Sequence, residues 1–227
     1  STLTFTSANW DTAQTATVTG VDDNLVDGSQ GSTVTISIDD FNSDNDFDAV
    51  ADQTVSVTTT DDDVAGFTIT ESSGSTGVAE SGTTDTFTVV LDAQPSSDVV
   101  IAIESDDTGE ATIVGSLTFT PVNWNAAQTV TVTGIDDDLI DGSQSSTISI
   151  TIVDAISDND FDSVVDQTVS VTTTDDDVAG FTIVESGGST SVDESGTTDT
   201  FTVVLDAEPA SDVLLTITSS DAGEATV

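Results

Sequence analysis

Aspartates occur in short clusters that directly follow runs of β-branched residues. One kind of cluster is VDDNLVDG at 21–28, which recurs as IDDDLIDG at 135–142. Another is a triplet of aspartates at 61–63, which recurs at 175–177. A hard divalent cation such as Ca²⁺ takes roughly six to eight oxygen ligands, mostly carboxylates and carbonyls on loops. Clusters of this composition at strand ends therefore predict calcium-binding loops.

The charge of the whole chain favours the same interpretation. Its 227 residues include 43 Asp and Glu but no Lys, Arg or His, so the formal net charge is −43. Salt screens exposed charges that are more than about 10 Å apart at 0.1 M ionic strength, but carboxylates in one cluster still repel one another. A uniformly acidic, hydrated surface, as in salt-adapted proteins, is the alternative. Because the aspartates are clustered, we favour bound divalent ions.

A third kind of cluster, SDNDFD, starts at Ser43 and again at Ser157. It resembles the opening of an EF-hand loop, which needs Gly at its sixth position and Glu at its twelfth. The sequence has Ala49 or Ser163 at the sixth position and valine at the twelfth in both copies. The cluster is therefore not an EF-hand, and metal binding and a solvated loop both stay open.

The residue types that are absent exclude several functions. Nucleic acids and anionic membrane surfaces are bound by Lys and Arg, and no apolar run reaches the length of a membrane-spanning helix. Without His, Cys, Lys, Arg or Tyr, most acid–base and nucleophilic catalysis is unavailable. The aspartic-protease triplet Asp107-Thr108-Gly109 becomes Asp-Ala-Gly in its second copy at 221–223. We therefore expect no enzyme.

The chain repeats itself with a period of 114 residues. DQTVSVTTTDDDVAGFTI occurs at 52–69 and 166–183, and TDTFTVVLDA occurs at 84–93 and 198–207, with no gap needed between the copies. Self-similarity at a fixed period is the signature of a repeat architecture. We interpret the chain as a window of a longer periodic array that opens in mid-repeat.

Each period reads as a series of short strands separated by Gly, Asp, Asn and Ser. The predicted strands are rich in β-branched residues, alternate or run apolar, and cover 87–91, 99–103, 117–120, 129–134, 146–152 and 168–174. About seven strands in roughly 110 residues are typical of an immunoglobulin-like sandwich of two antiparallel sheets. Trp10 and Trp124 are expected to pack in the core, rather than to stack on sugars.

The DDDVAGF junction is the natural boundary between successive sandwiches, because it closes one strand and opens the next repeat. It divides the chain into the C-terminal part of one repeat (1–63), a complete repeat (64–177) and the N-terminal part of a third (178–227). We expect the repeats to be arranged end to end.

Three segments of the chain resemble the Calx-β domain: TVTVTGIDDDLIDG, TVSVTTTDDDVAGFTIVE and SVDESGTTDTFTVVL. The resemblance implies a calcium-binding sandwich of the kind found in sodium–calcium exchangers and large bacterial surface proteins. Two features depart from that pattern: Gln144 replaces a loop Glu, and GEATIVGSLTF lacks a mid-domain Asp-Tyr motif. The clusters and the resemblance together give the predicted calcium ligands: Asp22, Asp23, Asp27, Asp61, Asp62, Asp63, Glu80, Asp136, Asp137, Asp138, Asp141, Asp175, Asp176, Asp177 and Glu194.

These features predict a calcium-stabilised structural repeat that acts as a rigid spacer or filament in an extracellular fibre or a cell-surface adhesin stalk. We expect the protein to be secreted and bacterial. The alternative is a self-assembling filament subunit that completes its sandwich by strand exchange with a neighbouring copy. A calcium-sensing regulatory module is a third hypothesis, although near-identical repeats favour copying for length. The expected partners are calcium ions and neighbouring repeats or identical subunits. Glycans or a cell-surface ligand elsewhere in the full protein stay open.

Overall fold

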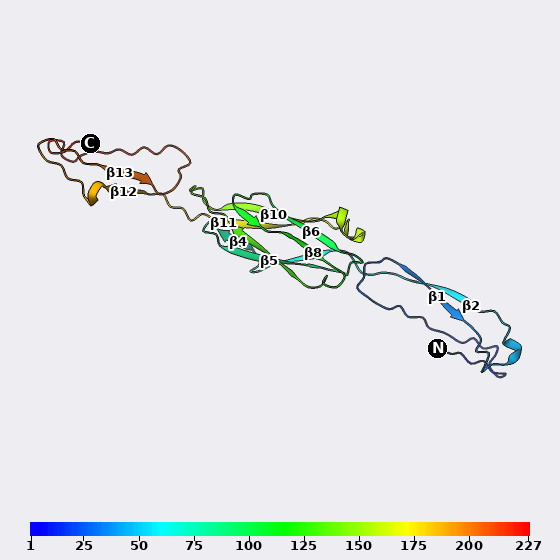
Figure 1. Ribbon diagram of the computed structural model, residues 1–227. Helices are drawn as coiled ribbons and strands as arrows, with labels where there is room; N and C mark the ends of the chain where they lie inside the picture. The colour runs from blue at the N-terminus through cyan, green and yellow to red at the C-terminus, as the bar shows by residue number, and fades with distance from the viewer.

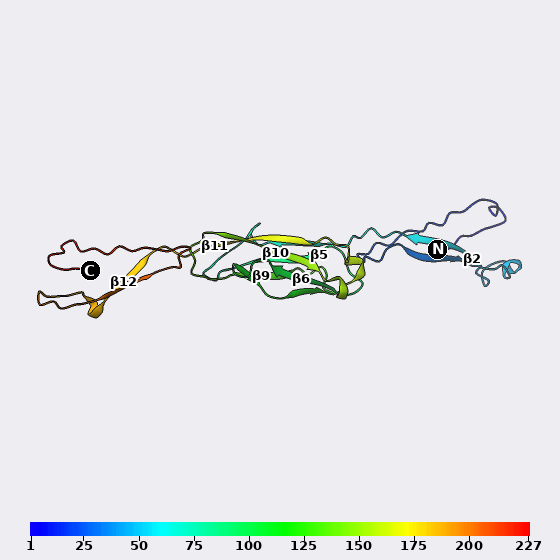
Figure 2. The ribbon, with the colours of Figure 1, turned by 90° about the horizontal axis from the view of Figure 1, so that it is seen from above.

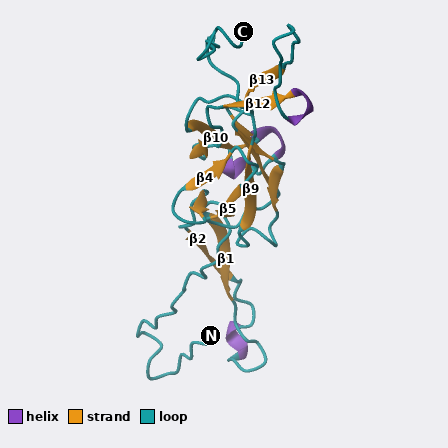
Figure 3. Cartoon of the chain, turned by 90° about the vertical axis from the view of Figure 1, so that its left-hand side faces the viewer, coloured by secondary structure: helices purple, strands orange, loops and turns teal.

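The chain extends along one axis as a central body with a smaller segment at each end (Figures 1 and 2). The computed structural model describes residues 1–227. Strands and loops dominate, with a few short 3-10 helices (Figure 3). None of the helices has the length and hydropathy that spanning a membrane requires. The division at 63/64 and 177/178 remains a prediction.

The central body is a sandwich of two sheets, which confirms the predicted all-β fold class. One sheet has the strand order β4-β11-β10-β6-β8, and the other has the order β3-β5-β9-β7. All neighbouring pairs are antiparallel except β4 and β11, which are parallel. The strands that form these sheets are β3 (Phe67–Glu71), β4 (Thr76–Ala79), β5 (Thr84–Leu91), β6 (Val99–Ser105), β7 (Ala111–Ile113), β8 (Ser116–Phe119), β9 (Gln128–Gly134), β10 (Gln144–Ile152) and β11 (Gln167–Thr174).

The core lies between these two sheets and follows from the alternation of the strands. In β11, Val169, Val171 and Thr173 point inward while the Thr and Ser between them are exposed. The core cluster contains 18 buried apolar residues, and Phe87, Phe119 and Phe161 are among its largest side chains. Burial of this apolar surface is the main force that holds the two sheets together.

The two end segments form only small sheets of their own. In the N-terminal segment, β1 (Gln30–Ile36) pairs with β2 (Gln53–Thr59). In the C-terminal segment, β12 (Phe181–Glu185) pairs with β13 (Phe201–Leu205). The short helices are η1 (Asn45–Phe47), η2 (Asp154–Ile156), η3 (Asn159–Phe161) and η4 (Ser186–Gly188). Trp124 packs against the central core, whereas Trp10 in the N-terminal segment is exposed.

Each end segment is joined to the central body by the same backbone contact. The Val26 N–H donates to the Gln94 carbonyl at 3.0 Å, and the Gln94 N–H donates to the Asn24 carbonyl at 2.7 Å. One period later, the Glu208 N–H donates to the Asp138 carbonyl at 2.6 Å. The loop that follows the VTG segment, at 18–20 and again at 132–134, therefore contacts the following repeat directly.

The third aspartate cluster has a structural role in the central body. Asp158 is 3% exposed and caps η3 by accepting a hydrogen bond from Asp160 N. Its other oxygen accepts hydrogen bonds from Ser96 Oγ and Ser97 N, both at 2.7 Å. Burial raises the pKa of Asp158, but these hydrogen bonds outweigh burial and hold the pKa below its usual value. The carboxylate thus joins the η3 loop to the β5–β6 connection.

We expect Asp158→Ala to destabilise the central sandwich by about 1–3 kcal/mol, because Ser96 Oγ, Ser97 N and Asp160 N all lose the buried carboxylate that accepts their hydrogen bonds. The lowered pKa means that this contribution is present above the ordinary aspartate pKa and is lost as pH falls through the folded-state pKa. Urea unfolding across the acid range measures it. The matched control is Asp44→Ala, because Asp44 is exposed and accepts only from Asp46 N. A stability difference that is unchanged at low pH would contradict this account.

Candidate metal centre

Three acidic segments meet at the end of the central sandwich that faces the C-terminal segment. Strands β4 and β11 run parallel with Ala79 opposite Thr174, so the residues that follow them emerge together. The backbone N–H of Glu80 continues this pairing and donates to the Thr174 carbonyl at 3.1 Å. The triplet at 175–177 begins directly after β11, and the loop at 136–141 follows the neighbouring end of β9.

A close backbone contact brings β4 and β9 together at this end. A side chain at Gly134 would place its Cβ only 2.1 Å from the Ala79 carbonyl oxygen. Only glycine permits this approach, because any Cβ there overlaps the backbone of β4. Glu80, the next residue after Ala79, is therefore held beside the start of the acidic loop.

Glu80 is buried without a partner. Its side chain is 1% exposed, and neither carboxylate oxygen has a hydrogen-bond partner. Burial raises its pKa first, and the nearby Asp175 and Asp137 carboxylates raise it further. The nearby backbone N–H of Asp176 lowers the pKa in part, although its geometry is too poor for a full hydrogen bond to either carboxylate oxygen. A buried carboxylate with no donor is costly unless a cation or a proton neutralises it.

Glu80, Asp137 and Asp177 converge on one point. One oxygen from each of them lies within 4.8 Å of the other two. Oxygens that bind one Ca²⁺ at about 2.3–2.6 Å are separated by no more than about 5 Å, so this spacing fits a shared ion. The carboxylate chemistry also fits a hard cation. Burial differs among the three residues: Glu80 is buried, Asp177 is partly exposed and Asp137 is exposed.

Asp175 organises the loop around this group. It accepts hydrogen bonds from Gly142 N at 2.8 Å and from Asp177 N at 2.7 Å. These backbone donors lower the pKa of Asp175. The pKa of Asp177 is raised, first by burial and then by the repulsion of Asp175 and the other nearby aspartates. The Asp175 carboxylate thus ties the triplet to the acidic loop, whereas the Asp177 carboxylate accepts no hydrogen bond from a side chain.

Glu110 is a further acidic residue at this end that sequence reasoning missed. Its Oε2 is buried without a hydrogen-bond partner, and burial together with Asp141, Asp107 and Asp137 raises its pKa. The Glu110 carbonyl accepts from Ile135 N at 2.9 Å, which fixes it beside the acidic loop. The signal was the motif GEAT, which leads into β7 and recurs one period later with the same glutamate.

The remaining predicted ligands of the central body lie around this group. Asp136, Asp138, Asp141 and Asp176 are exposed, and the Asp141 carbonyl accepts a hydrogen bond from Gln144. Glu194, the counterpart of Glu80 in the C-terminal segment, is exposed and takes no part in a comparable group.

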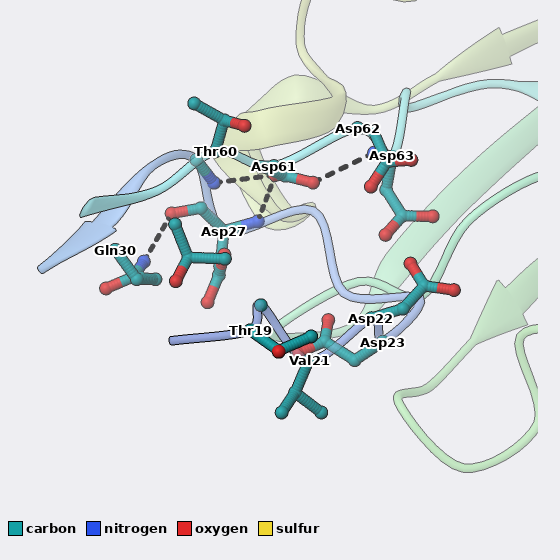
Figure 4. A pocket seen from close by; sticks show the side chains of 13 residues that line it. Thr19, Val21, Asp22, Asp23, Asp27, Gln30, Thr60, Asp61, Asp62 and Asp63 are labelled. Atoms are coloured by element: carbon teal, nitrogen blue, oxygen red, sulfur yellow. Dashed lines mark hydrogen bonds between the residues drawn. The ribbon is translucent and has the colours of Figure 1, made fainter. Parts of the chain in front are cut away.

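The N-terminal segment holds a second gathering of carboxylates. A pocket there is lined by the six predicted ligands of this repeat, namely Asp22, Asp23, Asp27, Asp61, Asp62 and Asp63. Figure 4 shows Asp22 and Asp23 on one loop opposite the Asp61–Asp63 triplet. Asp61 accepts from Gly28 N at 2.7 Å and from Asp63 N at 2.9 Å, as Asp175 does one period later. No glutamate lines this pocket, in contrast to the group around Glu80.

We expect Gly134→Ala to destabilise the central sandwich by about 1–3 kcal/mol and to weaken metal binding, because the new Cβ displaces the Ala79–Glu80 backbone. Calcium titration and urea unfolding measure the two effects. The matched control is Gly20→Ala one period earlier, where the added Cβ meets only Thr59 Cγ2 at 3.7 Å. Equal effects at the two positions would show that the close approach does not hold the site together.

Comparison with known proteins gives similarity to solved structures alone. No family model matches the chain, and no curated protein matches it. The apo form of the Calx CBD1 domain matches at 21% identity and a TM-score of 0.35, covering 49% of this chain and 98% of that domain. The calcium-binding domain structure CBD12 of CALX1.1 matches at 20% identity and a TM-score of 0.35, covering 48% of this chain and 45% of that one.

Domains 4 and 5 of the S-layer protein SbsC match at 24% identity and a TM-score of 0.34. That match covers 56% of this chain and 54% of the other. The chain thus spans about half the length of the CBD12 structure and of the SbsC structure. All of these similarities are low, so the metal centre rests on its own residues.

Proposed function

We propose that the chain is a calcium-binding structural repeat of an extracellular fibre or surface stalk, and that Glu80, Asp137 and Asp177 hold one calcium ion. The observation that carries the proposal is the buried, unpartnered carboxylate of Glu80 with two aspartates converging on it. The chain has no cationic side chain to neutralise this group. A divalent ion supplies the missing charge and binds oxygens left without donors.

The remaining predicted aspartates of the loop and the triplet surround the same end and supply further oxygens. Glu110 adds a buried carboxylate on the β7 side. Extracellular calcium modules bind with a Kd of about 10⁻⁴–10⁻³ M, which matches the calcium concentration outside cells. Occupied sites would also reduce the repulsion among the 43 acidic residues.

The position of the site gives the ion a mechanical role. Asp137 contributes an oxygen to the metal group, and the adjacent Asp138 carbonyl accepts the backbone hydrogen bond from Glu208 of the C-terminal segment. An ion that fixes the loop therefore also fixes its contact with the next repeat. Repeats joined in this way form a stiff rod, which suits a spacer or filament.

Small-angle X-ray scattering with calcium and with a chelator tests the mechanical role. We expect the maximum dimension to stay near that of a straight rod in calcium, and the chain to show a broader range of shapes after chelation. Sodium chloride at the same ionic strength is the control for screening. Identical scattering curves with and without calcium would contradict a calcium-stiffened junction.

A further inference from the structure

The central body receives the preceding repeat on the connection between β5 and β6, residues 92–98. An isolated parallel bridge joins Leu25 of the acidic loop VDDNLVDG to Gln94 of this connection. The next residue, Val26, packs against the core of the central body although it belongs to the N-terminal segment. The position of the receiving connection therefore decides how well the preceding repeat is held.

Two side chains hold the receiving connection in place. Gln94 Nε2 donates to the Pro121 carbonyl at 2.7 Å, and Ser96 Oγ donates to the buried Asp158 carboxylate, also at 2.7 Å. Pro121 follows β8 and Asp158 lies between β10 and β11, so the two bonds join the connection to distant parts of the sandwich. Both acceptors are oxygens without a proton, so each bond requires a donor on the connection.

The equivalent connection one period later, residues 206–212, has different residues at these two positions. Glu208 replaces Gln94, and Ala210 replaces Ser96. An ionised carboxylate has no proton to donate, and alanine has no hydroxyl. Residue type alone therefore excludes both hydrogen bonds from the second connection.

The loop that docks on the connection differs in the same way. VDDNLVDG has Asn24 where IDDDLIDG has Asp138. The carbonyls of these two residues accept the backbone hydrogen bonds across the junctions, from Gln94 N at 2.7 Å and from Glu208 N at 2.6 Å. One junction thus joins two amide residues, whereas the other joins two acidic residues. The amide junction has a second backbone bond, from Val26 N to the Gln94 carbonyl at 3.0 Å, which the acidic junction lacks.

We propose that the chain has two kinds of junction, a firm one at Asn24 and Gln94 and a compliant one at Asp138 and Glu208. At the firm junction, neutral residues meet on a connection that is fixed by side-chain donors. At the compliant junction, two like charges meet on a connection that lacks those donors, and like charges oppose contact. This inference rests on the proposed role as a spacer, and it adds that the spacer bends more readily at one junction than at the other.

Hydrogen exchange at the junction amide of Val26 tests the proposal. This N–H is protected while the junction is closed, and the amides of β10 report the stability of the central sandwich. The triple variant Asn24→Asp, Gln94→Glu, Ser96→Ala gives the firm junction the residues of the compliant one. We expect exchange at Val26 to become about 10-fold faster, the effect of losing one or two hydrogen bonds. All samples contain a chelator, so the result does not depend on whether the proposed calcium site exists.

A double-mutant cycle separates the junction from the sandwich. Asn24→Asp and Gln94→Glu are measured singly and together, and we expect the pair to accelerate exchange at Val26 by more than the product of the single effects, because the two new charges repel each other. About 1 M sodium chloride, where the screening length is about 3 Å, is expected to remove this excess. An excess of one, with no response to salt, would overturn the charge argument.

The matched control is Gln128→Glu. Gln128 Nε2 also donates to a backbone carbonyl, that of Thr118 at 2.8 Å, so the substitution removes the same kind of bond and adds the same charge away from the junction contacts. We expect exchange at Val26 relative to the β10 amides to match the parent in this control. Parent-like exchange at Val26 in the triple variant, or equal acceleration by the triple variant and the control, would overturn the proposal.

Discussion

Removal of calcium is expected to lower the melting temperature of the central sandwich by about 10–20 °C. With a Kd of about 10⁻⁴ M, calcium at about 10 mM is 100 times its Kd and stabilises the folded state by about 2.7 kcal/mol. For a domain of about 100 residues, each kcal/mol shifts the melting temperature by roughly 4–8 °C. Part of this binding free energy comes from neutralising the Glu80 carboxylate, which the apo protein keeps unpartnered in its interior.

Differential scanning calorimetry with calcium, with a chelator, and with sodium chloride at matched ionic strength measures this effect. Screening alone would let sodium chloride replace calcium, whereas a built site requires the divalent ion. Magnesium is expected to stabilise less, because it prefers a strict octahedral geometry and keeps its own water ligands. A melting temperature that depends only on ionic strength would rule out a specific ion at Glu80.

Glu80→Gln is expected to change stability in opposite directions with and without calcium. Without calcium, the substitution removes a buried charge and its repulsion with Asp137 and Asp175, so we expect stabilisation by about 1–3 kcal/mol. With calcium, the variant loses a charged ligand, and about 2–5 kcal/mol of binding free energy should disappear. A residue that only packs in the core would not stabilise the protein without calcium and destabilise it with calcium when substituted.

Urea unfolding and calorimetric calcium titration of the variant measure both effects. The matched control is Glu194→Gln, because Glu194 occupies the same repeat position but is exposed. We expect it to stay within about 0.5 kcal/mol of the parent in both conditions. If Glu80→Gln destabilised the protein equally with and without calcium, Glu80 would be a packing residue and not a ligand.

The strands of the central body could be predicted from the sequence because five of the six predicted runs have five or more residues that alternate or run apolar. All six predicted runs lie within or largely overlap strands β5, β6, β8, β9, β10 and β11. Strands β4 and β7 have only four and three residues, and β4 contains Gly77. Unlike LTFT in β8, neither TGVA in β4 nor ATI in β7 shows a readable alternation, and their pairing with β11 and β9 decides their conformation.

The end segments show the limit of local sequence most clearly. LTFT lies in strand β8 at Leu117, but the identical letters at Leu3 form no strand. In the central body, Leu117 pairs with Ile101 of β6, and no equivalent partner faces Leu3. A β-strand needs its neighbour, so identical residues adopt different structures when the neighbour is missing.

The sequence allowed the acidic residues of the candidate site to be predicted, but not how deeply each of them is buried. The sequence identified acidic clusters at strand ends, but burial of Glu80 depends on the backbone contact between Ala79 and Gly134, which no local pattern encodes. Glu110 was missed because a single glutamate between Gly109 and Ala111 resembles an ordinary turn residue. Asp158 shows the opposite case: its cluster resembles a metal-binding loop in sequence, but in the structure Asp158 is a buried helix cap.

Anomalous diffraction from crystals grown with calcium tests the central claim most directly. We predict a calcium peak bonded to carboxylate oxygens of Glu80, Asp137 and Asp177, at about 2.3–2.6 Å from each. A map with no peak at this position, or with ions only among the exposed aspartates and none bound to Glu80, would contradict the claim.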